Sequence, residues 1–223
     1  MILTWGAVVS IFLLAETVSE EAATGGEAGE WEVLFDGSDL MHWRNYQAED
    51  VDEKWKIIDG ALTLTAKGGG DLITREKYGA FELELEFRIS PKGNSGLMYH
   101  VTEEGKKSWN SGPEIQIIDD VAAKDGQKSG WLYQLYRAET NASKPAGEWN
   151  TLRIRISPDG SVHELNGERY FEYVKGSEDW DRRVAASKFS KFPFFGKASE
   201  GHICLQDHGN VVSFRNIRVR RLD

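Results

Sequence analysis

The sequence predicts an all-β domain, a sandwich or a barrel. Two observations lead to this fold class. Short runs in which apolar and polar residues alternate follow one another with turn signals between them, and long helical periodicity is scarce. The chain has 223 residues, which is enough for one large domain of this class. We predict that the domain covers residues 31–223.

Glycine, proline, asparagine and aspartate separate the predicted strands. Asp59-Gly60 and Asn166-Gly167 are two-residue turns of the kind that closes tight hairpins. In chain order, the predicted strands are Trp31–Phe35, Trp55–Ile58, Ala61–Thr65, Asp71–Thr74, Phe81–Ile89, Gly96–Val101, Glu114–Ile118, Asn150–Ile156, Ser161–Leu165, Glu168–Tyr173, His202–Asp207 and Val211–Arg220.

Two segments depart from this strand pattern. Glu178–Ser190 is predicted to hold a short helix, with Ser177 or Asp179 near its cap. The stretch from Val101 to Asn150 implies long loops around one strand, and loops of this size in a compact domain usually carry function.

The first residues form an apolar run, MILTWGAVVSIFLLA, without a charge before Glu16. The run is shorter than the about 20 residues of a transmembrane helix and suits a signal peptide or a short N-terminal anchor, residues 1–19. Residues 20–30 are small, acidic and glycine-rich, as in a flexible linker. We therefore expect export to the periplasm or the cell exterior. The sole cysteine, Cys204, excludes an internal disulfide.

The net charge of the chain argues against two classes of binding partner. The net charge is −9 and no basic stripe stands out, which argues against nucleic acid and against docking on an anionic membrane. A monomer and a homo-oligomer both remain open. Eight tryptophans suggest stacking platforms for a ligand as well as core packing.

Three predicted strands carry unusual polar rows, in GNSGLMYHV, GPEIQIIDD and GHICLQDHGN. Side chains alternate along a strand, so neighbouring strands would display one polar set on a single sheet face. That set comprises His100, Glu114, Gln116, Gln206 and His208. Each row alone could be an ordinary solvated face, such as Glu82, Glu84 and Glu86 in Phe81–Ile89. Glutamine and histidine are not solubilising charges, however, and together they favour a partly dry groove for a polar, uncharged ligand such as a sugar.

Glu114 is the one carboxylate in that set. A half-buried glutamate flanked by isoleucine, here Ile115, can have a raised pKa and act as an acid or base near neutral pH. His100 and His208 are the other proton carriers that we consider, although each alone could be structural.

Metal binding has little support in the sequence. The five histidines and one cysteine show no zinc-site spacing. Asp119, Asp120 and Asp207 could contribute to a calcium site, but no loop has the regular acidic spacing of a calcium hand. No cofactor is predicted, and a bound calcium stays open. The glycine-rich run Lys67–Asp71 lacks the features of a phosphate loop and is predicted to be a turn.

Aromatic residues gather in the long loops, in KKSWNSG and SGWLYQLYR. They could stack on the faces of a sugar or cover an edge of the sandwich. The residues concerned are Trp109, Trp131, Tyr133 and Tyr136.

A string of motifs in order resembles the 3-keto-disaccharide hydrolase domain family over about residues 31–222. Each motif is weak alone, but the ordered set is specific. The motifs are LFDGSDLMHW, WKIIDGAL, YGAFELELEFRI, GNSGLMYHV, GPEIQIIDD, KPAGEWN, ELNGE and GHICLQDHGNVVSFRNI. The resemblance implies a concanavalin-A-like jelly-roll sandwich of two antiparallel sheets. It also implies an exported bacterial enzyme that cleaves 3-keto-glycosides by acid–base hydrolysis or elimination and hydration.

On the matching positions, we predict Glu114 as the proton acceptor and His208 or His100 as the acid or oxyanion donor. The predicted substrate-binding residues are Asn94, Gln116, Asp119, Trp131, Tyr133, Tyr136, Gln206 and Asp207. The chain departs from the pattern at His100, where many relatives carry arginine, and at Glu164, where tryptophan is expected.

Two other classes of protein stay open. A non-catalytic carbohydrate-binding module could use the same sheet face and loop aromatics. A structural cell-surface protein is the third possibility, and it would have no pocket around Glu114.

Overall fold

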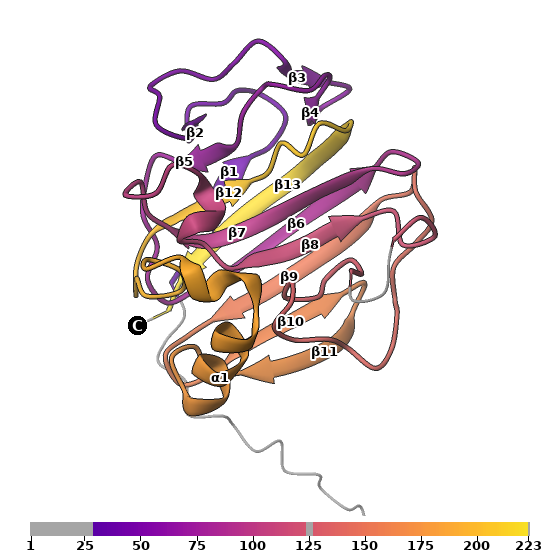
Figure 1. Cartoon of the computed structure of the whole chain (residues 1–223). Coiled ribbons are helices and arrows are strands. Elements are labelled where there is room, and N and C mark those ends of the chain that lie inside the picture. The colour runs from indigo at the N-terminus through magenta and orange to yellow at the C-terminus, as the bar shows by residue number, and fades with distance from the viewer. Residues whose placement is uncertain (1–28, 124–126, 223) are drawn as a thin grey trace, which may run out of the picture.

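The computed structural model describes residues 29–123 and 127–222 and shows two antiparallel sheets packed face to face (Figure 1). This confirms the predicted all-β, two-sheet sandwich. The predicted signal peptide or anchor, and the linker up to residue 28, lie outside the described residues. Within those residues, no helix is long and apolar enough to cross a membrane.

The larger sheet has the strand order β11-β10-β9-β6-β13-β4-β3, and β1 pairs with β13. Its longest pairing joins β6 to β13, with Leu83 opposite Val219. Its strands are β1 (Glu32–Phe35), β3 (Trp55–Ile58), β4 (Ala61–Leu64), β6 (Phe81–Ile89), β9 (Asn150–Ile156), β10 (Ser161–Leu165), β11 (Glu168–Tyr173) and β13 (Val212–Arg221).

The smaller sheet has the order β2-β5-β12-β7-β8. It brings together the three strands with unusual polar rows, because β7 pairs with β12 on one side and β8 on the other. Its strands are β2 (Trp43–Asn45), β5 (Leu72–Thr74), β7 (Asn94–Val101), β8 (Glu114–Ile118) and β12 (His202–Leu205).

Alternation along the strands builds the core between the sheets. On β6, every second side chain from Phe81 to Ile89 is buried in the main hydrophobic cluster. The smaller sheet contributes apolar side chains in the same way, among them Leu97, Ile115 and Leu205. The opposite face of the smaller sheet carries the polar rows beside a second, smaller apolar cluster of Ile73, Met98, Val101 and Cys204.

The predicted hairpins and helix are present. Asp59-Gly60 and Asn166-Gly167 all have positive φ and close the β3–β4 and β10–β11 hairpins. The helix α1 spans Glu178–Ala186, and the Ser177 hydroxyl accepts a hydrogen bond from the Trp180 amide at its start.

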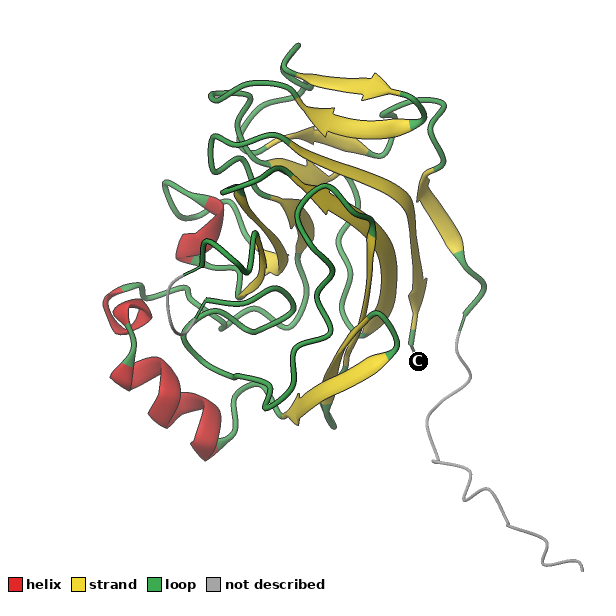
Figure 2. Cartoon of the chain, turned by 90° about the vertical axis from the view of Figure 1, so that its right-hand side faces the viewer, coloured by secondary structure: helices red, strands yellow, loops and turns green. Residues whose placement is uncertain are grey.

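Two short 3-10 helices complete the structure, η1 (Ser108–Asn110) and η2 (Lys188–Lys191). Figure 2 shows these two and α1 on the same side of the sandwich, away from the C-terminus. β2, with only three residues, was not predicted because so short a run carries little periodicity.

One predicted solvated position is buried. Glu82 on β6 is only 5% exposed, because Arg153, Arg155 and Arg220 from the neighbouring strands cover its carboxylate. Glu84 and Glu86, farther along the same face, form ion pairs with Arg218 and Arg215.

Candidate active site

The polar rows of β7, β8 and β12 meet on the outer face of the smaller sheet, as predicted. Gly96 lies opposite Gln116 and Met98 lies opposite Glu114 in the β7–β8 pairing. A cavity of ≈ 310 Å³ opens over this face. The predicted site residues that line it are Asn94, Glu114, Gln116, Tyr133, Gln206 and His208.

Glu114 is the buried titratable group of this cavity. Its side chain is 8% exposed, and burial raises its pKa to about 7. The negative charge of Asp71 raises it further, whereas the nearby Lys188 ammonium and a hydrogen bond with Gln206 lower it. A carboxyl group with such a pKa can act as an acid or a base near neutral pH.

Gly96 makes room for the Glu114 side chain. A methyl group at Gly96 would lie 2.8 Å from Glu114 Oε1 and 2.9 Å from its Cγ, so the side chain lies directly over this glycine. The backbone of Gly96 is not in the positive-φ region, so space rather than conformation requires glycine here.

Amide side chains frame the carboxyl group. The Gln116 Nε2 donates to Asn94 Oδ1 at 2.6 Å and to the Ser95 carbonyl at 3.1 Å, which holds the amide in place. The Gln206 Oε1 is buried and has no hydrogen-bond partner among the described atoms. A buried acceptor without a partner is costly, and a hydroxyl group of a bound ligand would satisfy it.

A second cavity of ≈ 560 Å³ adjoins the first and shares Trp109, Gln206 and His208 with it. We call the two cavities together the groove. Asp207 lines the second cavity, as predicted for a site residue, but its Oδ2 accepts the amides of Gly68 and Gly70, both at 2.9 Å. The glycine-rich run is thus a turn bound by Asp207.

Asp71 is a second, half-buried carboxyl group at the groove, and sequence reasoning missed it. Its Oδ1 accepts the Asp207 amide at 2.8 Å, and its Oδ2 accepts the Ser108 hydroxyl. Burial raises its pKa above the ordinary value for an aspartate. Both carboxylate oxygens of Asp71 therefore accept hydrogen bonds from other protein groups, whereas Glu114 lines the cavity.

The wall of the groove comes from segments that are distant in sequence. The Trp109 ring of η1 meets the Phe192 ring edge to face at 5.1 Å. Gln127, Lys188 and Lys191 line the same cavity. Trp109 belongs to the predicted aromatic set, but nothing local in the sequence marks the other four residues as site residues.

The predicted place of His100 beside Glu114 is wrong. In the pairing of β7 with β12, Tyr99 and His100 lie opposite Ile203 alone, and His100 has a φ of 51°. This bulge interrupts the alternation, so His100 leaves the polar face.

His100 lines a separate cavity of ≈ 290 Å³, and both of its ring nitrogens are engaged. Nε2 donates to the Gly79 carbonyl at 2.8 Å, and Nδ1 accepts from Lys175 Nζ at 2.6 Å. Burial and the Lys175 charge lower the pKa of His100 to about 4. His208 therefore remains the histidine of the groove.

Three other predicted site residues lie outside the groove. Tyr136 stacks on Tyr173 at 4.8 Å in the core, and its hydroxyl donates to Asp179. Trp131 contacts Gln116 through the backbone: the Trp131 carbonyl oxygen accepts a hydrogen bond from the backbone N–H of Gln116 at 2.9 Å. The Asp119 carboxylate accepts the Lys92 amide of the β6–β7 turn at 2.7 Å and the Val121 amide of its own turn at 3.1 Å. The physical reason is the same in each case, since loop geometry, not alternation, orients these side chains.

The three aspartates considered as calcium ligands bind different parts of the backbone. The Asp119, Asp120 and Asp207 carboxylates accept backbone amides of different loops. Within residues 29–123 and 127–222, no group of three or more His, Cys, Asp or Glu side chains is placed to hold a metal ion.

A two-sheet antiparallel sandwich hosts many unrelated functions, so the fold alone does not assign one to this chain. The family model described as "3-keto-alpha-glucoside-1,2-lyase-like domain" matches residues 30–220. The chain therefore belongs to this family, which confirms the resemblance found in its motifs.

Comparisons with individual proteins agree with this assignment. A 3-keto-disaccharide hydrolase of Bacteroides thetaiotaomicron is 36% identical over 85% of this chain and 78% of its own length. A crystal structure of a candidate glycosyl hydrolase from Parabacteroides distasonis is 33% identical, with a TM-score of 0.79 over 86% of this chain and 94% of that one. A galectin-like protein of unknown function from Bacillus subtilis is 12% identical, covers 89% of this chain and 97% of that one, and shares the fold with a TM-score of 0.57.

Proposed function

We propose that this chain is an exported enzyme that cleaves 3-keto-glycosides, with Glu114 as the general base. The observation that carries the proposal is a buried carboxyl group with a pKa of about 7 in a groove framed by amide side chains. The family and the named activity of the Bacteroides relative support the 3-keto substrate. The apolar N-terminal run supports export.

The chemistry follows from the ketone. A carbonyl group at C3 acidifies the C2 proton, and Glu114 removes it, so that the C–H electron pair forms an enediolate. The enediolate electrons then form the C1=C2 double bond, the C1–O bond breaks, and the leaving oxygen takes a proton. Water adds its hydroxyl to C1 and gives its other proton to the acid that protonated the leaving oxygen, and Glu114 returns the abstracted proton to C2. The net change consumes one water molecule and regenerates the base.

The other groove residues have roles that match these steps. His208 lines both cavities and is our candidate for the acid that protonates the leaving oxygen. Gln206 and Gln116 would hold ring hydroxyls and the enediolate oxygen. An ordinary glycosidase uses two free carboxyl groups across the scissile bond. Here Asp71 is bonded through both oxygens, which favours the proton-abstraction route over direct hydrolysis.

The proposed base predicts a pH profile. Because Glu114 must be ionised to accept a proton, kcat/KM on a 3-keto-glycoside is expected to rise with pH and to reach half its plateau near pH 7. An unperturbed glutamate would reach that point near pH 4.3. Initial rates between pH 5 and pH 9 measure it, and a half-point below pH 5.5 would exclude Glu114 as the titrating base.

Replacing Gly96 by alanine is expected to lower kcat/KM by about a hundredfold, because the new methyl group would displace the Glu114 carboxyl group. The midpoint of thermal unfolding should change little, since the backbone accepts alanine. Gly79→Ala is the matched control, because its Cβ would meet nothing closer than the Ser199 carbonyl at 3.7 Å. Equal rates in both variants would contradict the close packing of Glu114 over Gly96.

The direct test is incubation of the purified protein with 3-keto-trehalose, 3-keto-glucosides and the unoxidised sugars, followed by mass spectrometry. The expected result is that the leaving group is released from the 3-keto sugars and not from the unoxidised sugars. Saturable binding of plain sugars without any release would instead favour the carbohydrate-binding module.

A further inference from the structure

Five lysines surround the groove, although the chain as a whole carries a net charge of −9. Lys67, Lys106 and Lys107 line the second cavity, and Lys188 and Lys191 line the cavity of Glu114. Ion pairs within 4.0 Å occur throughout the described residues, yet none of them involves these five lysines. The groove thus presents five cations that no carboxylate of the described residues holds in an ion pair.

The loop that carries Lys67 is held in place. Asp207 Oδ2 accepts the Gly68 and Gly70 amides, which ties this turn to the end of β12. The aliphatic stem of Lys67 lies over Gly209, because a Cβ at that glycine would be 3.3 Å from Lys67 Cγ and Cδ. The position of Lys67 at the cavity is therefore set by the fold.

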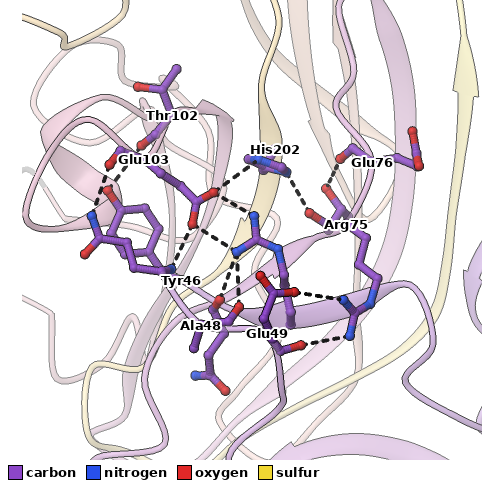
Figure 3. Close-up of polar contacts among 12 residues, drawn as sticks. Tyr46, Ala48, Glu49, Arg75, Glu76, Thr102, Glu103 and His202 are labelled. Atoms are coloured by element: carbon purple, nitrogen blue, oxygen red, sulfur yellow. Dashed lines mark hydrogen bonds and ion pairs between the residues drawn. The ribbon is translucent and has the colours of Figure 1, made fainter.

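Side-chain contacts also anchor the loop that carries Lys106 and Lys107, and Figure 3 shows those around Glu103 and Tyr46. Glu103 accepts two hydrogen bonds from Arg44, at 2.9 and 2.6 Å. The Gly105 carbonyl accepts the Tyr46 hydroxyl at 2.7 Å and the Gln47 amide at 3.0 Å. Bidentate arginine–carboxylate pairs are among the stronger polar contacts in proteins. These contacts hold the two lysines at the rim.

Lys188 is positioned by an aromatic ring. Its Nζ lies 4.3 Å from the centre of the Tyr133 ring, a cation–π contact beside Glu114. Lys188 thus lies in the cavity of Glu114, where the reacting sugar would bind. Lys67, Lys106 and Lys107 lie in the second cavity, farther along the groove.

The carboxyl groups of the groove do not balance these charges. Glu114 and Asp71 both favour the neutral form more than a free carboxyl group does, and Asp207 is occupied by backbone amides. A neutral sugar gains little from a row of cations. An anionic group gains attraction and a faster encounter, and the low-dielectric wall of Trp109 strengthens the field.

From this arrangement, and resting on the proposed function, we infer that the second cavity binds an acidic group on the leaving portion of the 3-keto-glycoside. Lys67, Lys106 and Lys107 would bind this group, which is a carboxylate, a sulfate or a phosphate. The leaving portion is assigned to this cavity because the cavity shares His208, the proposed acid, with the cavity of Glu114.

The test compares 3-keto-glucosides that differ only in the leaving group: 4-carboxyphenyl, 4-sulfophenyl and 4-phosphophenyl against 4-methoxyphenyl. The expected result is a kcat/KM about tenfold higher for at least one acidic substrate at low salt, falling toward the neutral value at about 0.5 M NaCl. The three acidic groups separate a carboxylate site from a sulfate or phosphate site. Equal values for all four substrates would overturn the inference while leaving the proposed function intact.

The triple variant Lys67→Gln, Lys106→Gln, Lys107→Gln assigns the preference to the second cavity. It should react with acidic and neutral substrates at comparable rates. The control variant Lys56→Gln, Lys77→Gln, Lys92→Gln removes the same charge from exposed positions that line neither cavity and should keep the preference. A preference that survives in the first variant would contradict the inference.

Binding provides a readout that does not depend on turnover. Calorimetry with the unoxidised 4-carboxyphenyl and 4-methoxyphenyl glucosides should show about tenfold tighter binding of the acid, lost in the first triple variant and kept in the control. If no keto-sugar is cleaved but this difference is present, the proposed function fails and the acidic subsite stands. If neither glucoside binds more tightly, the subsite is disproved.

Discussion

Replacement of Glu114 by glutamine is expected to reduce kcat/KM on a 3-keto-glycoside by about a thousandfold, the usual worth of a positioned general base. The amide has nearly the same shape as the carboxyl group, so it should still fit over Gly96 and beside Gln206. It cannot accept the C2 proton at any pH, and the rise in rate near pH 7 should disappear with it. Steady-state kinetics on 3-keto-trehalose measures both effects.

The same variant offers an internal control through stability. The pKa of Glu114 is about 7 in the folded protein, above its value in the unfolded chain, so the protonated form favours folding. That contribution is fully present below about pH 4.3 and is lost as the pH rises through 7. Glutamine never ionises, so Glu114→Gln should be more stable than the parent at pH 8, by up to about 3 kcal/mol, and equally stable at pH 4.

An inactive variant with raised stability at pH 8 would show that a reactive group, not the fold, was lost. Unchanged activity would exclude Glu114 as the base and would favour a binding role for the groove.

Replacement of Glu82 by alanine is expected to destabilise the sandwich by about 3 kcal/mol. The Glu82 carboxylate is buried and accepts hydrogen bonds from Arg220 at 2.7 Å and from Arg153 and Arg155, both at 3.3 Å. Its removal would leave the guanidinium groups of Arg155 and Arg220 without a carboxylate partner, and Arg153 with only Glu164 at 4.0 Å. Thermal unfolding measures the effect, and for a domain of this size we expect a midpoint lower by roughly 6–12 °C.

Glu84→Ala is the matched control, because Glu84 lies on the same face of β6, is more exposed, and pairs with Arg218 alone. A single exposed pair is worth at most about 1 kcal/mol, so this variant should change the midpoint little. The activity of both variants should follow their folded fraction, since this face belongs to the larger sheet and the groove to the smaller one. Equal destabilisation by the two variants would show that the arginine cluster tolerates the loss of Glu82.

The Glu82 site also has a pH signature. Burial alone would raise the pKa of Glu82, but hydrogen bonds and charges from Arg220 and Arg153 outweigh it and lower the pKa below the ordinary value. Its stabilising contribution is therefore present above about pH 4.3 and is lost as the pH falls through the folded pKa. The difference in stability between the parent and Glu82→Ala should shrink toward acid pH.

Much of the groove could be predicted because strand alternation is a local property. Glu114, Gln116 and Gln206 alternate with buried isoleucines and leucines, so their face follows once the strands exist. The hairpin turns at Asp59-Gly60 and Asn166-Gly167 were predictable for the same reason, since positive φ selects their residue types. Helix α1 and its cap at Ser177 were also visible in the sequence.

The failures have a common physical origin in departures from regular strands. His100 kept its predicted strand but lost its predicted face, because a bulge opposite Ile203 shifts the alternation by one residue. Trp131 and Tyr136 lie in irregular segments, where side-chain direction depends on the whole loop. In such segments the residue type indicates what a side chain could do but does not indicate where it points.

By itself, the sequence determined the all-β class, the chain positions of the strands and turns, the family, and the polar face that carries Glu114. Only the tertiary structure decided which residues complete the site, because Asp71, Lys188 and Phe192 come to the groove from segments distant along the chain. It also decided the electrostatics. Burial raises the pKa of Glu114, and the lysines around the groove become one positive field only when antiparallel pairing brings their loops to the same face.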